Sequence, residues 1–316
     1  TKKKKRLPRL DIANAGSGFH QVLLLLAFFY GRPASVFLLD EPDAHLHFIL
    51  QKEIFDLLEK VAAQRNCQLI VATHSEALLD DHQPSGVVSF VGPAPRVLVD
   101  SIERNQMREA LKKITTTELL KAQQVGAVFY VESDSDYKIL REWANILKHK
   151  SLKFLERPFI HALFGRSLHE AKEHFFAIKA CYSSIKGLCI LDGDNRDLPD
   201  AEIDKQGLKV LRWNRYEIEN YLLHPEPIKR YLKFPLSNNI IDSFFKEQFP
   251  QDINLFGMNA ALVRVKASTE YLVPLLERAQ RPTPKNHLYL IASVMKQYEI
   301  HPEVKQKLDA IAELVE

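Results

Sequence analysis

The chain has 316 residues, of which 46% are hydrophobic and 26% charged, and a net charge of +3. This is the composition of an ordinary globular protein, long enough for about two domains that each bury a core. The charge is too small to demand an anionic partner. Three isolated cysteines predict reduced core residues in a cytoplasmic protein and argue against a zinc site. The longest apolar run, residues 22–30, is too short to span a bilayer, so we expect no membrane partner.

The first predicted elements are an Ala-Gly-Ser-Gly loop and, up to residue 30, an almost wholly apolar helix. A helix of this composition is expected to be buried. Its start, at Ser17 and Gly18, offers backbone N–H groups and a positive dipole end, which suit a phosphate group. An ordinary helix cap has the same sequence features, so this motif alone leaves both possibilities open.

Two apolar runs that end in polar residues follow, at residues 35–42 and 68–75. Both are typical of strands buried on both faces of a parallel sheet. The first run ends in Asp40 and Glu41, and the second ends in Thr-His-Ser with His74 at its centre. Ligands bind at the carboxyl ends of such strands, which makes these residues candidates for a binding site.

These three motifs, in this order, resemble the signature motif, the Walker B motif with its D-loop, and the switch histidine of ABC-type ATPases. The resemblance is to the structural-maintenance-of-chromosomes class. It implies that Ser17 and Gly18 close over an ATP molecule that a second subunit holds. It also implies that Asp40 orients Mg²⁺ through water, that Glu41 positions the attacking water, and that His74 senses the γ-phosphate.

No G-x-x-x-x-G-K-[ST] loop occurs in the 316 residues. Without that loop a nucleotide loses its main phosphate contacts. We therefore expect that the chain is N-terminally truncated, or that another polypeptide carries the missing half of the lobe. This chain alone is not expected to hydrolyse ATP.

Proline and glycine residues punctuate two short strand-like runs, residues 87–91 and 96–99, which predict a hairpin that closes the first lobe. We place the domain boundary near residue 122. The ATPase half is then residues 1–122, a second domain covers residues 123–224, and a helical region covers residues 225–316.

Strand-like and helix-like segments alternate through the second domain, which predicts a parallel α/β sheet. Glu132 follows the first strand, and Asp192 and Asp194 follow the third, where residues i and i+2 point to the same face. If these strands are neighbours, three carboxylates meet and repel one another unless a cation such as Mg²⁺ or Mn²⁺ lies between them. For Asp192 and Asp194 alone, a solvated Asp-Gly turn is the alternative.

The segment that begins Tyr130-Val-Glu-Ser-Asp-Ser-Asp and the segment Leu191-Asp-Gly-Asp resemble the glutamate and DxD motifs of a Toprim domain. Ser133 stands where the glutamate motif usually has a glycine. An ABC-type lobe followed by a Toprim domain is the layout of the OLD (overcoming lysogenisation defect) family of nucleases. The resemblance covers most of residues 12–225.

The OLD family is described as using two metal ions, so the resemblance implies two Mg²⁺ or Mn²⁺ ions here. The ligand set that it implies for the two ions is Glu132, Asp192 and Asp194 for one, and Asp136 with Glu217 or Glu219 for the other. Glu217 and Glu219 lie on one face if their segment is extended. A role as surface carboxylates is equally open for this pair.

The region from residue 225 onward has a helical pattern, with expected helices at residues 240–249, 260–278, 286–298 and 302–315. Pro284 opens one helix and puts Lys285 in its first turn, where the helix dipole disfavours a cation by ~0.3–1 kcal/mol. OLD nucleases have an essential lysine in this region, and the resemblance makes Lys285 the candidate. A merely solvated lysine is the alternative.

The sequence thus predicts a metal-dependent DNA endonuclease or nickase of the OLD type, coupled to ATP hydrolysis in the intact protein and serving phage defence or DNA repair. One ion would activate water, the second would stabilise the leaving 3′ oxygen, and Lys285 would neutralise charge that grows on the phosphorane. Expected partners are DNA, a second copy of the chain in a homodimer, and an accessory subunit.

The main alternative is a DNA-binding or regulatory ATPase module whose Toprim fold does not cut DNA. Strand passage or primer synthesis would need a nucleophilic tyrosine domain or a polymerase context. The sequence shows neither, although it leaves Tyr221 and Tyr289 open as nucleophiles.

Overall fold

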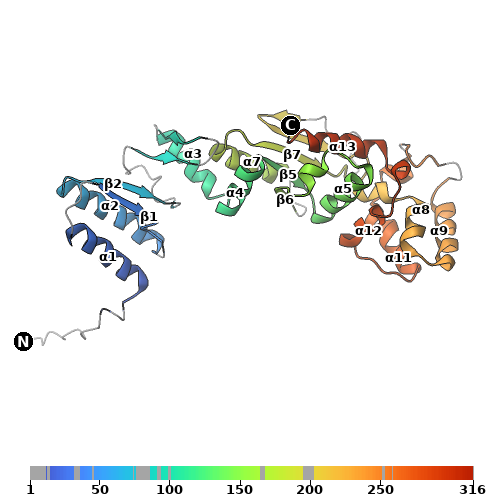
Figure 1. Cartoon of the computed structure of the whole chain (residues 1–316). Helices are drawn as coiled ribbons and strands as arrows, with labels where there is room; N and C mark the ends of the chain where they lie inside the picture. Colours follow the sequence, from blue (N-terminus) through green and yellow to red (C-terminus); the bar gives the residue numbers. More distant parts are fainter. Residues whose placement is uncertain are drawn as a thin grey trace, which may run out of the picture. The chain divides into compact units, whose positions relative to one another are not determined.

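The structure is a computed structural model, and the chain divides into two compact units that we describe separately (Figure 1). The first unit comprises residues 1–88 and 97–108, and the second comprises residues 89–96 and 109–316. Among the described residues, no helix combines the length and the apolar character needed to cross a membrane. The structure describes residues 12, 15–31, 36–44, 46–73, 75, 86–90, 94–98, 101–163, 168–194, 203–250, 253–257 and 259–315.

The first unit is built on two parallel strands, β1 (Val36–Asp40) and β2 (Gln68–Ala72). The parallel pairing confirms the prediction from the two apolar runs. Their register pairs Asp40 with Ala72, so both carboxyl ends lie side by side. The helices α1 (Ser17–Gly31) and α2 (Phe48–Gln64) contribute the buried residues of a small core, which are Phe29, Leu46, Ile54, Leu58, Val61 and Ala62.

Two expectations about burial are wrong in this unit. Helix α1 was expected to be buried, but Phe29 is its one buried residue in the described structure. Strands β1 and β2 were expected to be covered on both faces, yet Leu38 is 74% exposed and Ile70 58% exposed. The physical reason is that side chains of both helices pack in one core with Phe37 of β1 and Leu69 of β2. Within the described residues, one face of the sheet therefore has a cover and the other has none.

Short elements connect this part of the chain to the second sheet. Strands β3 (Val88–Ser89) and β4 (Arg96–Val97) pair in a two-stranded sheet, as the predicted hairpin requires. They are followed by α3 (Ser101–Leu111) and α4 (Thr116–Val125). Helix α4 ends at Gly126, whose φ of +74° favours glycine, and β5 begins at the next residue.

The second unit contains a five-stranded sheet in the order β6-β5-β7-β9-β8. Four of the strands are parallel, which confirms the expected α/β class: β6 (Ile160–Ala162), β5 (Ala127–Val131), β7 (Lys186–Leu191) and β9 (Leu208–Arg212). The fifth strand, β8 (Ile203–Lys205), is antiparallel to β9. We did not expect it, because a three-residue Ile-Asp-Lys segment carries no strand pattern.

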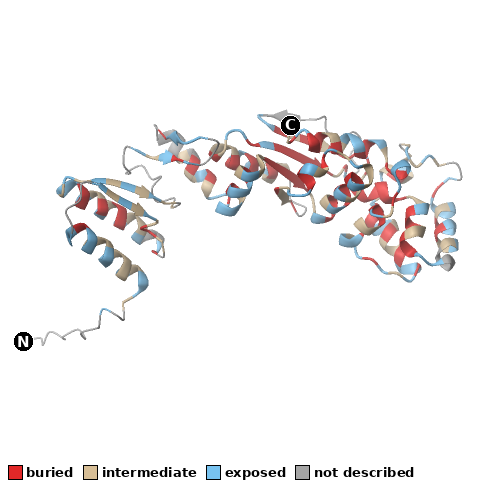
Figure 2. Ribbon diagram, viewed as in Figure 1, coloured by how far each residue is buried: buried red, intermediate tan, exposed pale blue. Residues whose placement is uncertain are grey.

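Helices cover both faces of this sheet, which explains why its central strands are continuous apolar runs (Figure 2). On one face, Phe129 and Val131 belong to the core that α5 (Asp134–Leu147) and α13 (Pro302–Ala312) also line. On the other face, the hydroxyl of Tyr130 lies 2.9 Å from Nδ1 of His174 in α7 (Leu168–Cys181). Alternate residues of β5 therefore point into different layers.

The C-terminal helical region is confirmed, but two of its expected helices are broken. Instead of continuous helices over residues 260–278 and 286–298, the structure has short α, 3₁₀ and π segments. One physical reason lies at Ser268, whose backbone N–H donates to the carboxylate of Glu217. The helical elements not yet named are α6 (Leu152–Leu155), α8 (Pro225–Leu232), α9 (Pro235–Gln248), α10 (Ala260–Val263), the π-helix η4 (Ser268–Leu272), α11 (Val273–Arg278), α12 (Tyr289–Ala292) and the 3₁₀ helices η3 (Ile218–Leu222), η5 (Lys285–His287) and η6 (Gln297–Glu299).

Two helices of this region begin at histidine N-caps, which makes their stability depend on pH. Nδ1 of His224 accepts a hydrogen bond from the Glu226 N–H at the start of α8, and Nδ1 of His301 accepts one from the Glu303 N–H at the start of α13. Only a neutral imidazole can accept in this way. Burial lowers the pKa of both histidines below the ordinary value.

We expect the cap at His301 to weaken in acid. Because the folded-state pKa is below the unfolded value of about 6.5, the unfolded chain binds more protons, and stability is lost as the pH falls below about 6.5. His301→Asn keeps a capping acceptor that does not titrate. When the pH is lowered from 8 to 5, the unfolding free energy of this variant in urea should fall by about 1 kcal/mol less than that of the wild type. Equal pH dependence in the two proteins would contradict the prediction.

Candidate active site

The carboxyl ends of β5 and β7 bring two of the predicted carboxylates together. The strands are adjacent and parallel, with Tyr130 paired with Cys189, so the residues that follow them emerge at one edge. Oε1 of Glu132 accepts a hydrogen bond from the Asp192 N–H at 2.9 Å. Oδ1 of Asp192 in turn accepts one from the Ile218 N–H at 3.1 Å. The two side chains are thus fixed by backbone groups of neighbouring segments.

The turn after Asp192 requires the glycine at its centre. A Cβ atom on Gly193 would lie 2.4 Å from the carbonyl oxygen of Arg215 and 2.7 Å from that of Trp213. Asp194 follows with φ of +51°, and its N–H donates to the carbonyl oxygen of Tyr216 at 3.0 Å. Its side chain is exposed. The structure therefore has an Asp-Gly turn, but of the two carboxylates beside Gly193 only that of Asp194 is exposed to solvent.

Asp136 reaches the same region from the first turn of α5. Its two carboxylate oxygens accept hydrogen bonds from Ser133, from the hydroxyl at 2.6 Å and from the backbone N–H at 3.2 Å. Ser133, which departs from the usual motif glycine, is the N-cap residue of α5, and Asp136 accepts its N–H as in a capping box. Burial raises the pKa of Asp136, and the ammonium group of Lys285 partly offsets this rise. Asp136 thus has a structural role as a cap and lies within electrostatic range of the other site residues.

Glu217, Glu219 and Lys285 complete the group. Nζ of Lys285 lies 2.9 Å from Oε2 of Glu217 and 3.5 Å from Oε1 of Glu219. The expected extended conformation holds for Glu217 alone, since Glu219 lies in the 3₁₀ helix η3. Their side chains are 1% and 0% exposed, respectively, so neither is a surface carboxylate. We call Glu132, Asp136, Asp192, Glu217 and Glu219 the carboxylate cluster.

Glu219 is the member of the carboxylate cluster whose surroundings fit a bound cation best. Both of its oxygens are buried and, in the described part of the chain, neither has a hydrogen-bond partner. A buried carboxylate that is offset only by a lysine ammonium group at 3.5 Å is costly, and a hard divalent cation with oxygen ligands would lower that cost. The oxygen donors of the carboxylate cluster are therefore of the type that suits Mg²⁺ or Mn²⁺.

The pKa shifts within the carboxylate cluster also favour a bound cation. Burial, together with the charges of Asp136, Glu132, Glu219 and Glu217, raises the pKa of Asp192 well above its ordinary value. Burial and the neighbouring Glu217 raise the pKa of Glu219 to about 8. Burial lowers the pKa of Lys285, but Glu219 and Glu217 outweigh it and hold this pKa above its ordinary value. One lysine thus faces an excess of carboxylates.

In the first unit, the nucleotide-binding candidates lie at the ends of the two strands. Asp40 ends β1, and the Glu41 N–H donates to the carbonyl oxygen of Ala72 at 2.8 Å. Ser17 and Gly18 begin α1. His74 lies outside the described residues.

Two residues that the sequence analysis did not single out join these segments. Nε2 of Gln21 in α1 donates to the carbonyl oxygen of Pro42 at 2.9 Å. The hydroxyl of Thr73 donates to Oδ1 of Asp43 at 2.7 Å, and Asp43 is buried. The segments that carry the three motifs are therefore connected within the first unit.

Residues 3–80 match a family model described as "AAA domain, putative AbiEii toxin, Type IV TA system". This part of the chain is similar to an AAA-type ATPase domain. A search of curated proteins found no match. The matched segment contains all three nucleotide-binding motifs and ends well before Glu132. The match therefore does not extend to the carboxylate cluster.

The scaffold of the site includes residues that sequence reasoning missed. Arg215 is buried and donates to the carbonyl oxygen of Asn220. Nδ2 of Asn220 donates to the carbonyl oxygens of Leu262 and Val265, each at 2.7 Å. The available signal was the presence of polar residues inside the segment Arg-Tyr-Glu-Ile-Glu-Asn-Tyr-Leu, which is otherwise suited to a core.

Proposed function

We propose that this chain is a metal-dependent DNA nuclease of the OLD type, with a Toprim catalytic domain at residues 123–224. The observation that carries the proposal is the carboxylate cluster, which lies at the carboxyl edge of a parallel sheet and includes a buried glutamate without a hydrogen bond. Ligand sites of parallel sheets lie at that edge. We propose that it acts on DNA in the cytoplasm, in phage defence or DNA repair.

In this proposal the residues would hold two ions, as the resemblance to the OLD family implies. Glu132, Asp192 and Asp194 would hold one Mg²⁺ or Mn²⁺, and Asp136 with Glu217 or Glu219 would hold the other. Such ions, when bound, lower the pKa of water and stabilise a leaving oxygen. The chain itself fixes Glu132 through the Asp192 N–H.

Lys285 has a positioning role in this proposal. Its ammonium group pairs with Glu217 and Glu219, and it keeps 40% of its side-chain surface exposed. It can therefore orient both carboxylates and still present positive charge to a DNA phosphate. Neutralising charge that develops on a phosphoryl group is the corresponding catalytic contribution.

The first unit would be part of an ATPase lobe that is coupled to the nuclease in the intact protein. ATP and Mg²⁺ would bind only where a Walker A loop is supplied, because the 316 residues contain none. A homodimer that pairs the signature motif of one chain with the nucleotide of another, and an accessory subunit, are the assemblies that we propose.

One observation favours a second candidate function, a DNA-binding or regulatory module that does not cut. Lys285 already forms ion pairs with Glu217 and Glu219, so part of the carboxylate charge is neutralised without a metal ion. This candidate predicts DNA binding that needs no metal and weakens strongly with salt, because phosphate contacts dominate it. It also predicts no cleaved product.

The test is cleavage of supercoiled and linear DNA with Mg²⁺, with Mn²⁺ and with a chelator. We expect nicked or linear product only with metal. Glu132→Gln and Asp192→Asn should each lower the rate by about 10³-fold, the order that loss of one electrostatic contribution costs. The matched control is Asp134→Asn, which changes an exposed carboxylate in the first turn of α5 and should leave the rate unchanged. Wild-type activity in Glu132→Gln, or metal-independent binding without cleavage, would reject the proposal.

A further inference from the structure

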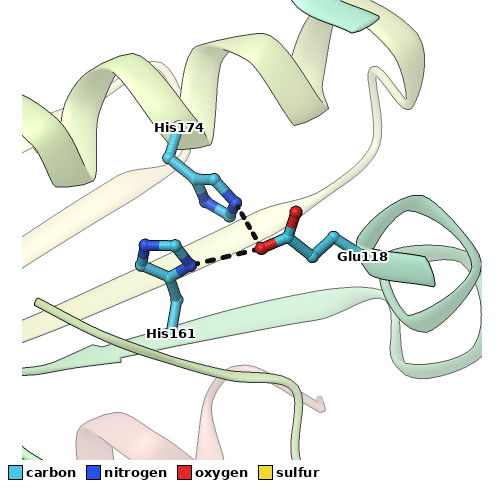
Figure 3. Close-up of side chains that lie close together, drawn as sticks. All are labelled: Glu118, His161 and His174. Atoms are coloured by element: carbon cyan, nitrogen blue, oxygen red, sulfur yellow. Dashed lines mark hydrogen bonds and ion pairs between the residues drawn. The ribbon is translucent and has the colours of Figure 1, made fainter. Parts of the chain in front are cut away.

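A second group of metal-ligating side chains differs from the carboxylate cluster in its donor atoms and in the helices and strand that carry it. It consists of Glu118 from α4, His161 from β6 and His174 from α7 (Figure 3). Oε1 of Glu118 lies 3.3 Å from Nε2 of His174 and 3.5 Å from Nδ1 of His161. The three ligand atoms lie within 4.8 Å of one another. We call these residues the histidine triad.

Hydrogen bonds hold two side chains of the triad, those of Glu118 and His174, so that one ligand atom of each faces the shared centre. Oε2 of Glu118 accepts hydrogen bonds from the N–H and the hydroxyl of Thr115 in the capping box of α4, which leaves Oε1 facing the two imidazoles (Figure 3). Nδ1 of His174 bonds to the hydroxyl of Tyr130, which leaves Nε2 facing Glu118. The rings of His161 and His174 stack with centroids 3.9 Å apart and an interplanar angle of 28°.

The separations suit a small tetrahedral ion. Zinc bonds of about 2.0–2.2 Å to nitrogen and oxygen place neighbouring ligand atoms roughly 3.3–3.5 Å apart in a tetrahedron. Both oxygen–nitrogen separations of the triad, 3.3 and 3.5 Å, fall in this interval. One ligand nitrogen of each ring faces the same carboxylate oxygen of Glu118 (Figure 3).

The chemistry of the donors separates this site from the carboxylate cluster. Imidazole nitrogens suit Zn²⁺, Co²⁺, Ni²⁺ and Cu²⁺, whereas a set of carboxylates suits Mg²⁺ and Mn²⁺. A ligating histidine usually donates its second ring N–H to another group, and the hydroxyl of Tyr130 is placed to accept from His174. Burial and the neighbouring His161 also lower the pKa of His174 to about 4, which keeps its imidazole neutral at pH 7.

We propose that Glu118, His161 and His174 bind one divalent transition-metal ion of the Zn²⁺ type. The cysteine pattern argued against a zinc site, but the triad needs no thiolate. Its ligands come from a helix, a strand and a second helix of the same unit, so the ion would fasten α4 to β6 and α7. The proposal does not depend on nuclease activity, because it concerns a different set of residues.

The experiment uses the full chain, stripped of metal and titrated with Co²⁺ while Mg²⁺ saturates the carboxylate cluster. We expect one equivalent of Co²⁺ with the visible spectrum of a four-coordinate ion, and displacement of that spectrum by one equivalent of Zn²⁺. His161→Ala and Glu118→Gln should each weaken binding by at least about 100-fold. Tyr130→Phe should weaken it by about 10-fold, as loss of an outer hydrogen bond does.

The matched control is His169→Ala, because His169 lies on α7 with its side chain 79% exposed, outside the triad. It should leave the spectrum and the stoichiometry unchanged. Far-UV circular dichroism of each variant verifies that it is folded, and Asp192→Asn should bind Co²⁺ at the triad as the wild type does. An absent four-coordinate spectrum, or one that His161→Ala retains in full, would overturn the proposal.

Discussion

The Lys285→Met substitution is expected to lower both the DNA cleavage rate and the stability of the metal-free chain. Lys285 is the cation that contacts Glu217 at 2.9 Å and Glu219 at 3.5 Å, and both carboxylates are buried. Removing one partner of a buried ion pair costs about 3–5 kcal/mol, because the other charge stays buried. Since Lys285 remains 40% exposed to water, we expect a smaller loss, of about 2 kcal/mol.

The cleavage rate should fall by at least about 10²-fold, the lower end of what one lost electrostatic contribution costs. Urea unfolding in a chelator measures the stability, and a plasmid-nicking assay measures the rate. Adding Mn²⁺ should restore part of the lost stability, because the ion replaces the missing positive charge. Lys305→Met, which changes an exposed lysine in α13, is the matched control and should alter neither quantity by more than about 0.5 kcal/mol or about twofold.

The double variant Lys285→Met/Glu219→Gln distinguishes a charge effect from a packing effect. If Lys285 matters through its charge, removing the charge of Glu219 should recover much of the lost stability. If the double variant is less stable than Lys285→Met alone, the electrostatic explanation is wrong.

The sheet and its carboxyl edge could be predicted from the sequence because strands buried on both faces leave continuous apolar runs. The runs around Phe129 and Leu188 are of this kind, and each leads directly to a carboxylate. The adjacency of β5 and β7, which the sequence left as a condition, then brings Glu132 and Asp192 to one edge. Their hydrogen bond, from the Asp192 N–H to Glu132, is a consequence of that pairing.

The same apolar pattern misled us in the first unit. An apolar run predicts two covered faces, but the cover comes from other elements, which the run does not specify. Leu38 and Ile70 are as apolar as the residues of β5, yet they are exposed in the described structure. Burial is a property of the neighbours as much as of the segment itself.

The histidine triad shows a different limit. Glu118, His161 and His174 come from three elements, and no motif spacing relates them. Their meeting depends on the tertiary packing of α4 and α7 on the sheet, which periodicity does not specify. The only local signal was the capping pattern of Thr115 and Glu118, which predicts a helix start and says nothing about His161.

The Glu219→Gln substitution is expected to stabilise the metal-free chain and to weaken metal binding at the carboxylate cluster. Glu219 is fully buried, and in the described part of the chain neither of its oxygens has a hydrogen-bond partner. Because burial and Glu217 raise its pKa to about 8, Glu219 must take up a proton, or stay charged at a cost, when the metal-free chain folds near pH 7. Glutamine has no charge to neutralise, so Glu219→Gln should raise the unfolding free energy of the metal-free chain by about 1–2 kcal/mol.

If Glu219 is the residue that joins Asp136 as a ligand in the proposed function, the effect should reverse when metal is present. A ligand at 100 times its Kd stabilises the folded state by about 2.7 kcal/mol, and a weakened site loses most of that gain. Urea unfolding in a chelator should thus show Glu219→Gln as more stable than the wild type. Adding Mn²⁺ should raise its unfolding free energy by less than that of the wild type. Glu277→Gln, at an exposed position in α11, should follow the wild type in both conditions. If Glu219→Gln is destabilised in the chelator, the ion pair with Lys285 outweighs the charge excess, and the cluster does not need a metal ion.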